Sequence, residues 1–256
     1  MTDLVSVTQA GEVATVTLHR PEAYNAFNRA MRARFASALI QLESDPTIRI
    51  VVLHGSGRGF SAGVDLKEPA GRPSHEVLED EFRPCLEPIW TSQKLYIASV
   101  HGHAAGIAAA LVLACDLVVM ETEAALSLAF AEIGLIPDGG LCWHLTQALG
   151  PQKALAAIIE GAGLPADRCF QAGLANRVVD PGAALDAAQA WARELAGRAP
   201  LAVSAAKALV SRSRSSTLAE MFSAEAAAQT RLAGSQDHQR GVTAFLARSA
   251  PVFRGD

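Results

Sequence analysis

The segment GFSAG at residues 59–63 places Ser61 between two glycines, in the GxSxG pattern of a serine nucleophile on a sharp turn. That chemistry needs a strand that runs straight into the serine and a helix that follows it at once. Here residues 55–58 separate the motif from the preceding apolar run, and residues 66–71 have the composition of a loop. His238 has the sequence order of a triad histidine, but no motif surrounds it. A nucleophilic Ser61 is therefore the minor alternative.

The nearby histidines and glycines offer two other kinds of site. His101 and His103 could form a metal pair, but no carboxylate cluster at ligand spacing accompanies them, so we expect solvated or loop-packing histidines. Gly55, Gly57 and Gly59 are spaced GxGxG rather than GxGxxG, and no GK[ST] follows them, so no nucleotide loop is predicted. We expect neither a metal nor a nucleotide cofactor.

Two glycine loops have the composition to hold an oxyanion. Gly63–Val64 in the first loop and Gly106–Ile107 in the second could each present a backbone N–H where a side chain would obstruct it. The second loop begins a predicted helix, whose dipole adds positive potential. One such donor is worth about 3–4 kcal/mol in known sites. From spacing alone, two tight turns are the simpler interpretation.

Asp138 is the carboxylate best placed for proton transfer. It lies between Pro137 and Gly139 in GLIPDGG (134–140), on a predicted loop before a helix. An acid/base aspartate would have its pKa raised by burial among apolar neighbours. An aspartate just before a helix is also a common N-cap, so both interpretations stay open at this stage.

The loops that carry these residues follow apolar runs. Residues 48–53 and 96–100 have the composition of strands buried on both faces, and each run leads into a glycine loop. The other predicted elements are a hairpin at 5–7 and 14–18, a helix from Asn28 that ends at Asp45, short strands at 117–120 and 125–128, an irregular helix after a loop within 66–92, and helices after residue 151 except at 176–179. We therefore expect an α/β fold with a helical C-terminal third.

Composition excludes several classes of protein. The 256 residues are half apolar, which argues against disorder, and a net charge of −4 lacks the basic face of a nucleic-acid binder. The longest uncharged apolar run, 104–115, is shorter than the roughly 20 residues that a membrane span needs. No signal peptide is evident, and the four cysteines form no CxxC pair. We expect a cytoplasmic protein with reduced thiols and no membrane partner.

Six motifs occur in an order that resembles the enoyl-CoA hydratase/isomerase (crotonase) superfamily over essentially the whole chain. They are HRPEAYNAF (19–27), GSGRGFSAGVDL (55–66), HGHAAG (101–106) with CD at 115–116, GLIPDGG (134–140), AGLANRVV (172–179) and GVTAFLARSAPVF (241–253). The resemblance implies an α/β spiral of ββα units (1–195), a helical C-terminal trimerisation region (196–256), and a homotrimer or hexamer. It implies an acyl-CoA thioester substrate and no cofactor beyond that coenzyme A.

The resemblance also implies a set of site residues. The oxyanion donors would be the backbone N–H groups of Val64 and Ile107. The residues implied to bind the substrate are Arg20, Ala23, Tyr24, Ala62, Gly63, Lys67, Gly106, Phe130, Phe253 and Arg254. Of these, Phe253 and Arg254 would reach the adenine pocket of a neighbouring subunit.

The chain departs from the hydratases of this family at two positions. Hydratases carry two glutamates that activate water, and the corresponding positions here hold Ala110 and Phe130, which cannot move a proton. Glu132 is two residues from the second position, and we assign it no role. The resemblance is closest to isomerases, including the epoxyphenylacetyl-CoA isomerase type, in which an aspartate at the place of Asp138 is the acid/base. One carboxylate suffices for a 1,3-proton shift.

Three hypotheses follow for the function. The first is isomerisation of a double bond or ring through a thioester enolate, with Asp138 as acid/base. The second is a hydratase with weak or atypical water activation, and the third is an acyl-CoA binding protein without catalysis. Four further residues are expected to be structural: Asp65 in the oxyanion loop, Asp237 and Arg240 in helix-start and packing contacts, and Lys207 on an exposed face.

Overall fold

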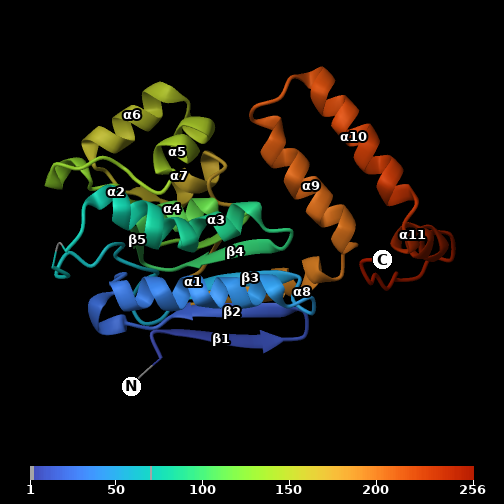
Figure 1. Ribbon diagram of the computed structural model, residues 1–256, viewed down its shortest axis with the longest axis horizontal. Helices are drawn as coiled ribbons and strands as arrows, with labels where there is room; N and C mark the ends of the chain where they lie inside the picture. The colour runs from blue at the N-terminus through green and yellow to red at the C-terminus, as the bar shows by residue number, and fades with distance from the viewer. Residues whose placement is uncertain (1–2, 70) are drawn as a thin grey trace.

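A six-stranded sheet forms the centre of the structure, a computed structural model that describes residues 3–69 and 71–256 (Figure 1). The strand order is β1-β2-β3-β4-β6-β9, with β1 antiparallel to β2 and every later neighbour parallel. The strands are β1 (Val5–Ala10), β2 (Val13–Leu18), β3 (Ile50–Gly55), β4 (Leu95–Val100), β6 (Leu117–Glu121) and β9 (Arg177–Val179). The predicted hairpin and the two predicted buried strands are confirmed.

Both faces of this sheet are covered by helices, which explains the continuous apolar runs. In β3, Val51 and Leu53 pack into the core shared with α1 (Arg29–Ser44) and α4 (Ile107–Ala114). Ile50 and Val52 face the opposite way, against the alanine stripe of α8 (Ala184–Ala196). Because successive side chains of a strand point to opposite faces, a strand between two layers must be apolar at every position.

A small second sheet holds the second glycine loop in place. It consists of β5 (His103–Ala105), β7 (Ala125–Ser127) and β8 (Leu164–Pro165) in the order β5-β7-β8. The Ser61 N–H donates to the His103 carbonyl at 3.2 Å, and the Ala105 N–H donates to the Ser61 carbonyl at 2.9 Å. The two glycine loops are therefore joined directly by backbone hydrogen bonds.

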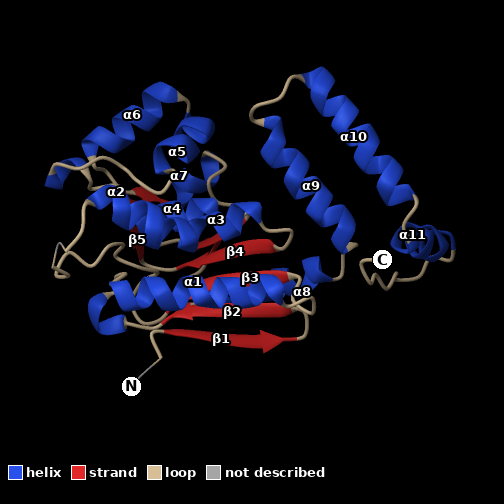
Figure 2. Cartoon of the chain, in the orientation of Figure 1, coloured by secondary structure: helices blue, strands red, loops and turns tan. Residues whose placement is uncertain are grey.

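The helices complete the α/β layers (Figure 2). The segment after residue 73 is the predicted irregular helix: α2 (Ser74–Val77), a π-helical turn η2 (Leu78–Phe82) and α3 (Arg83–Thr91), which contains Pro88. The remaining elements before β9 are the 3-10 turns η1 (Pro21–Ala23) and η3 (Ala131–Ile133) and the helices α5 (Leu141–Leu149), α6 (Pro151–Glu160) and α7 (Ala166–Gln171).

The C-terminal helices α9 (Pro200–Ser213), α10 (Leu218–Ala233) and α11 (Gln236–Leu246) extend to one side of the sheet (Figure 1). The chain end folds back on α11, where Asp237 accepts hydrogen bonds from the Arg254 and Gly255 N–H groups and pairs with Arg240. The predicted packing role of Asp237 and Arg240 is confirmed.

Two expectations drawn from composition can be compared with the described residues. No helix in residues 3–69 and 71–256 is long and apolar enough to cross a membrane. All four cysteines are free thiols, of which Cys85, Cys115 and Cys169 are buried and Cys142 is exposed.

The prediction that Lys207 lies on an exposed face is wrong. Its side chain is only 8% exposed, and its ammonium donates three hydrogen bonds of 2.8 Å, to the carbonyls of Ile89 and Lys94 and to the Asp116 carboxylate. An ammonium has three donors, and all of them are satisfied, by groups near the end of α3 and immediately before β4 and β6. Lys207 thus joins α9 to the sheet.

Replacing Lys207 tests this anchor. The Lys207→Met substitution removes the cation and leaves the Asp116 carboxylate buried without its ion-pair partner, so the free energy of unfolding should fall by about 3 kcal/mol or more. Urea titration followed by circular dichroism measures the change. Lys153→Met on α6 is the matched control, because Lys153 is exposed and should have little effect. Equal stability of the two variants would contradict an anchoring role.

Candidate active site

A cavity of about 920 Å³ lies between the start of α1, residues 64–69 and 71–72, the helical segment 74–90 and the loop before α5. Val64 and Asp138 line this cavity from opposite loops. Its apolar wall includes Val77, Phe82, Leu86 and Pro137. One predicted oxyanion donor, Val64, and the predicted acid/base, Asp138, therefore line the same cavity, which is apolar on one wall.

The direction of the Val64 N–H follows from the hydrogen bond on the other end of its peptide group. The Gly63 carbonyl accepts from the Phe27 N–H at 2.7 Å. In a trans peptide the C=O and the following N–H point in opposite directions, so the Val64 N–H points away from Phe27. Gly63 has a φ of +82°, and a Cβ there would lie 2.4 Å from the Ala105 carbonyl oxygen. Glycine is therefore required for the loop to approach so closely.

Ile107 is presented in the same way by the second loop. It is the first residue of α4, and the preceding Gly106 carbonyl accepts from the Ala109 N–H at 2.9 Å. The Ile107 nitrogen is 3.4 Å from the position of a Cβ built on Gly63, so the two loops are adjacent. Within residues 3–69 and 71–256, neither the Val64 nor the Ile107 N–H donates a hydrogen bond. Both groups are free to bind an anionic oxygen.

The Asp138 side chain has a buried oxygen and does not cap helix α5. In the described part of the chain its Oδ1 is buried and has no hydrogen-bond partner. Burial removes water from the carboxylate and raises the pKa of Asp138 to about 6. The N-cap position of α5 is Gly140, and no side chain caps that helix. The alternative interpretation of Asp138 as an N-cap is therefore wrong, and the expected pKa shift is confirmed.

The positions without glutamates are apolar and lie beside these loops. Ala110 is fully buried on α4, and a Cβ built on Gly139 would lie 2.8 Å from the Ala110 Cβ. The Asp138–Gly139 loop thus occupies the space beside Ala110. The Phe130 ring is buried near Gly106, because a Cβ built on Gly106 would lie 3.8 Å from that ring. Glu132 is exposed, and its carboxylate lies beside Gly161 after α6.

The predicted substrate-binding residues fall into two groups in space. One group is formed by segment 20–24, which contains Arg20 and Ala23, and segment 62–67, which contains Lys67. The Ala62 N–H donates to the Tyr24 carbonyl at 2.8 Å and so joins these two segments. Asp65 accepts from Arg20 and from the Lys67 N–H, which confirms its predicted local structural role. By contrast, Phe253 packs on Gly241 of α11, and Arg254 is exposed on the tail. The structure does not bring these two residues to the cavity of their own chain.

The serine-hydrolase and metal alternatives find no geometry to support them. Ser61 is 1% exposed, and its hydroxyl donates to the Asn25 carbonyl and accepts from the Gly63 N–H. His101 stacks on His54 at 4.9 Å, and His103 contacts the Ser127 hydroxyl. The described residues contain no group of three or more potential metal ligands. Ser61 and the two histidines are therefore residues that shape the loops.

Sequence reasoning missed two residues that organise the site. Asn25 is fully buried with a φ of 55°, and its amide donates to carbonyls at Ser56, Gly59 and Phe60. Arg32 is 4% exposed and lines the cavity. Asparagine adopts the left-handed backbone conformation more often than most residues, so Asn25 in a loop was a recognisable sequence signal for a tight turn. The arginine resembled an ordinary polar residue of an amphipathic helix.

The comparisons with known proteins agree with this geometry. A family model described as enoyl-CoA hydratase/isomerase matches residues 8–256. The chain is 38% identical over 251 residues (95% of each chain) to the 1,2-epoxyphenylacetyl-CoA isomerase of Escherichia coli strain K12. It is 31% identical over 255 residues (100% of each chain) to the 2,3-dehydroadipyl-CoA hydratase of the same organism. A crystal structure of an enoyl-CoA hydratase from Polaromonas sp. JS666 matches with a TM-score of 0.92 at 33% identity, over 98% of this chain and 99% of that one.

The fold is therefore the α/β crotonase fold, and the protein is an acyl-CoA enzyme of that superfamily. The chain belongs to the enoyl-CoA hydratase/isomerase family.

The buried carboxylate predicts a pH-dependent cost to stability. Because the pKa of Asp138 is about 6 in the folded protein, against an ordinary value of 3.8, folding favours the protonated form. Stability is lost as the pH rises from about 4 through 6. The Asp138→Asn variant should therefore be more stable than the native protein by about 3 kcal/mol at pH 8, and this difference should vanish below pH 4.

Thermal and urea unfolding at pH 4 and pH 8 measure the difference. Asp180→Asn is the control, because Asp180 is exposed. A pH-independent difference between the Asp138→Asn variant and the native protein would contradict a buried, ionisable Asp138.

Proposed function

We propose that the protein isomerises the acyl group of a CoA thioester through an enolate, with Asp138 as the single acid/base. The observation that carries the proposal is a carboxyl that lines the cavity, has a buried Oδ1 and lies near two backbone N–H groups, none of the three having a hydrogen-bond partner among the described residues. For a 3-enoyl-CoA, the Asp138 carboxylate takes a proton from C2. The electron pair moves into the thioester, and the Val64 and Ile107 N–H groups stabilise the negative oxygen.

The same carboxyl then completes the reaction. The protonated Asp138 returns its proton to C4, the enolate collapses, and the double bond moves from C3–C4 to C2–C3. Proton and charge balance without a second catalytic group. A pKa near 6 suits this role, because the group both accepts and returns a proton near neutral pH. The 38% identity to a 1,2-epoxyphenylacetyl-CoA isomerase supports an isomerase, and ring isomerisation belongs to the proposal for that reason.

A hydratase is the second candidate, because a 2,3-dehydroadipyl-CoA hydratase is 31% identical over the whole chain. Water addition needs groups that orient and deprotonate water, and Ala110 and Phe130 provide none. The alternative from another class is an acyl-CoA binding protein without catalysis. Tight binding of thioesters with no turnover, and no effect of changing Asp138, would favour it.

We further propose a cytoplasmic homotrimer or hexamer that needs no cofactor beyond the coenzyme A of its substrate. The exposed apolar side chains on α10 and α11 support subunit contacts, since large exposed apolar patches commonly mark interfaces. They are Leu218, Phe222, Phe245 and Leu246, each more than 70% exposed in the single chain.

Replacing Asp138 tests the assignment. With 3-enoyl-CoA as substrate, Asp138→Asn should lower kcat about 100-fold or more, because the amide cannot accept the C2 proton. In the native enzyme kcat/KM should fall as the pH drops below about 6, where Asp138 is protonated. Crotonyl-CoA is the parallel substrate for hydration. Rapid hydration of crotonyl-CoA by the Asp138→Asn variant would overturn the assignment.

A double substitution tests why hydration is disfavoured. Ala110→Glu with Phe130→Glu should raise crotonyl-CoA hydration about 10-fold or more, if these positions hold the water-activating groups in hydratases. Isomerisation should fall, because Gly139 packs on Ala110 and a larger side chain must displace the Asp138 loop. Hydration no faster than that of the native protein, in a variant that folds, would contradict the correspondence of these positions.

A further inference from the structure

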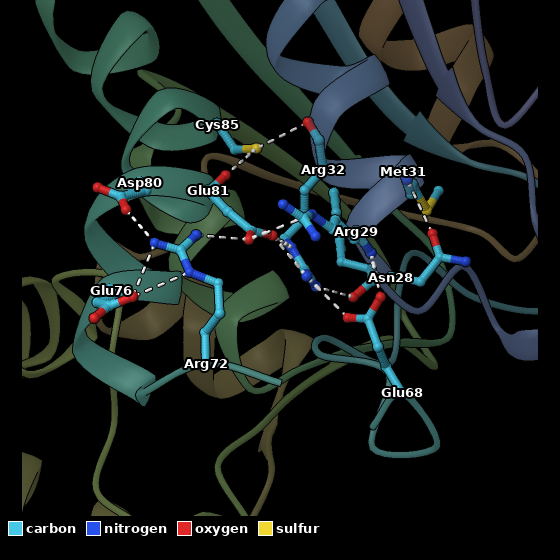
Figure 3. Close-up of polar contacts among 11 residues, drawn as sticks. Asn28, Arg29, Met31, Arg32, Glu68, Arg72, Glu76, Asp80, Glu81 and Cys85 are labelled. Atoms are coloured by element: carbon cyan, nitrogen blue, oxygen red, sulfur yellow. Dashed lines mark hydrogen bonds and ion pairs between the residues drawn. The ribbon is translucent and has the colours of Figure 1, made fainter. Parts of the chain in front are cut away.

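A buried arginine, Arg32, contacts residues of three separate segments, and Figure 3 shows it beside Glu68 and Glu81. Arg32 is 4% exposed on α1. Its guanidinium donates to the Phe27 carbonyl at 2.9 Å, to Glu68 at 2.8 Å and to Glu81 at 2.8 Å. It also lies over the Phe82 ring, 5.1 Å from the centroid. A buried cation is stable only when its partners stay in place, so this arginine fixes the relative positions of the groups around it.

One of those partners controls the oxyanion loop. The Phe27 carbonyl accepts from Arg32 and also from the Asp65 N–H at 3.2 Å. The Phe27 N–H donates to the Gly63 carbonyl at 2.7 Å. Phe27 therefore holds the chain on both sides of Val64, and through the Gly63–Val64 peptide it sets the direction of the Val64 N–H. Arg32 is therefore connected to the proposed oxyanion donor, the Val64 N–H, through a single intermediate residue, Phe27.

The other partners belong to the cavity wall. Glu68 and Glu81 both line the cavity, and Glu81 lies in the π-helical turn η2. Glu68 also accepts from the Arg29 N–H at 2.7 Å, so the segment after the oxyanion loop is fastened to the start of α1. A π-turn inside a helix is frequently found at functional sites. A shift of the cavity wall would move Arg32 and, with it, Phe27.

We propose that Arg32 is a positioning residue that couples the acyl-cavity wall to the Val64 N–H. This proposal rests on the oxyanion contact of the proposed function, but not on which reaction Asp138 performs. Removing Arg32 should weaken stabilisation of an enolate more than it weakens binding of the neutral thioester. A merely structural role would reduce stability and leave the enolate equilibrium unchanged.

Enolisation of bound acetoacetyl-CoA measures this directly, because its enolate absorbs in the ultraviolet. The apparent pKa of the bound ligand is titrated, and its Kd is measured at a pH where it is neutral. In the native protein the bound pKa should lie below that of free acetoacetyl-CoA. In Arg32→Gln it should rise by about one unit, a tenfold loss in the enolisation equilibrium, with less than about a threefold change in Kd.

Matched variants separate positioning from folding. Arg32→Lys keeps the charge and should give an intermediate pKa of the bound ligand, while Glu81→Gln replaces the charged partner of Arg32 with a neutral one and should shift that pKa in the same direction. These two carry the test if Arg32→Gln does not fold. Arg177→Gln is the control, because Arg177 is a half-buried arginine stacked on Trp191, outside the cavity. It should leave the pKa unchanged.

The outcomes distinguish this proposal from the proposed function. An unchanged enolate pKa in folded Arg32→Gln, or an equal shift in Arg177→Gln, would overturn the role of Arg32. A native protein that does not lower the ligand pKa would overturn the oxyanion contact and the Arg32 proposal together. The native protein could lower the ligand pKa, and the Arg32 variants could lose this effect, while the protein has no isomerase activity. That result would overturn only the reaction assigned to Asp138.

Discussion

The site depends on two peptide groups whose carbonyls are hydrogen-bonded away from the cavity. The Gly63 carbonyl accepts from Phe27 and the Gly106 carbonyl accepts from the first turn of α4, so the N–H groups of Val64 and Ile107 have no partner in the part of the chain that the structure describes. The Gly63 N–H donates to the Ser61 hydroxyl, and the Gly106 N–H donates to the Ser127 carbonyl in the small second sheet. A side chain at Gly63 would meet the Ala105 carbonyl, so the fold can bring the loops together only with glycine there.

The second constraint is that the placement of Asp138, the proposed acid/base, opposes stability. The Oδ1 of Asp138 is buried, and no group in the described chain pairs with it. Removing water from the carboxylate costs free energy on folding, and the same desolvation raises the pKa of Asp138 to about 6. The Gly139 backbone reaches this position because Ala110 is small. The alanine that removes a water-activating carboxylate thus also makes room for the loop that presents Asp138.

The sequence predicted the strands and the loops well, because their causes are local. Continuous β-branched runs indicate strands buried on both faces, and β3 and β4 are such strands. The raised pKa of Asp138 followed from its apolar neighbours. Arg32 was missed and the position of Lys207 was predicted wrongly, because the partners of these side chains are distant in the sequence. Glu81 is 49 residues from Arg32, and Ile89 is 118 residues from Lys207. Helical periodicity carries no information about such contacts. Phe253 and Arg254 lie on the C-terminal tail away from the cavity of their own chain, and their contact with a neighbouring subunit stays a prediction.

A crystal structure with a bound, slowly reacting acyl-CoA analogue tests the account most directly. We predict that the thioester oxygen lies within about 3 Å of both the Val64 and the Ile107 nitrogens, and that an Asp138 oxygen lies about 3–4 Å from C2 or C4 of the acyl chain. A thioester oxygen bound elsewhere, or an acyl chain that leaves the Asp138 carboxyl out of reach, would contradict it.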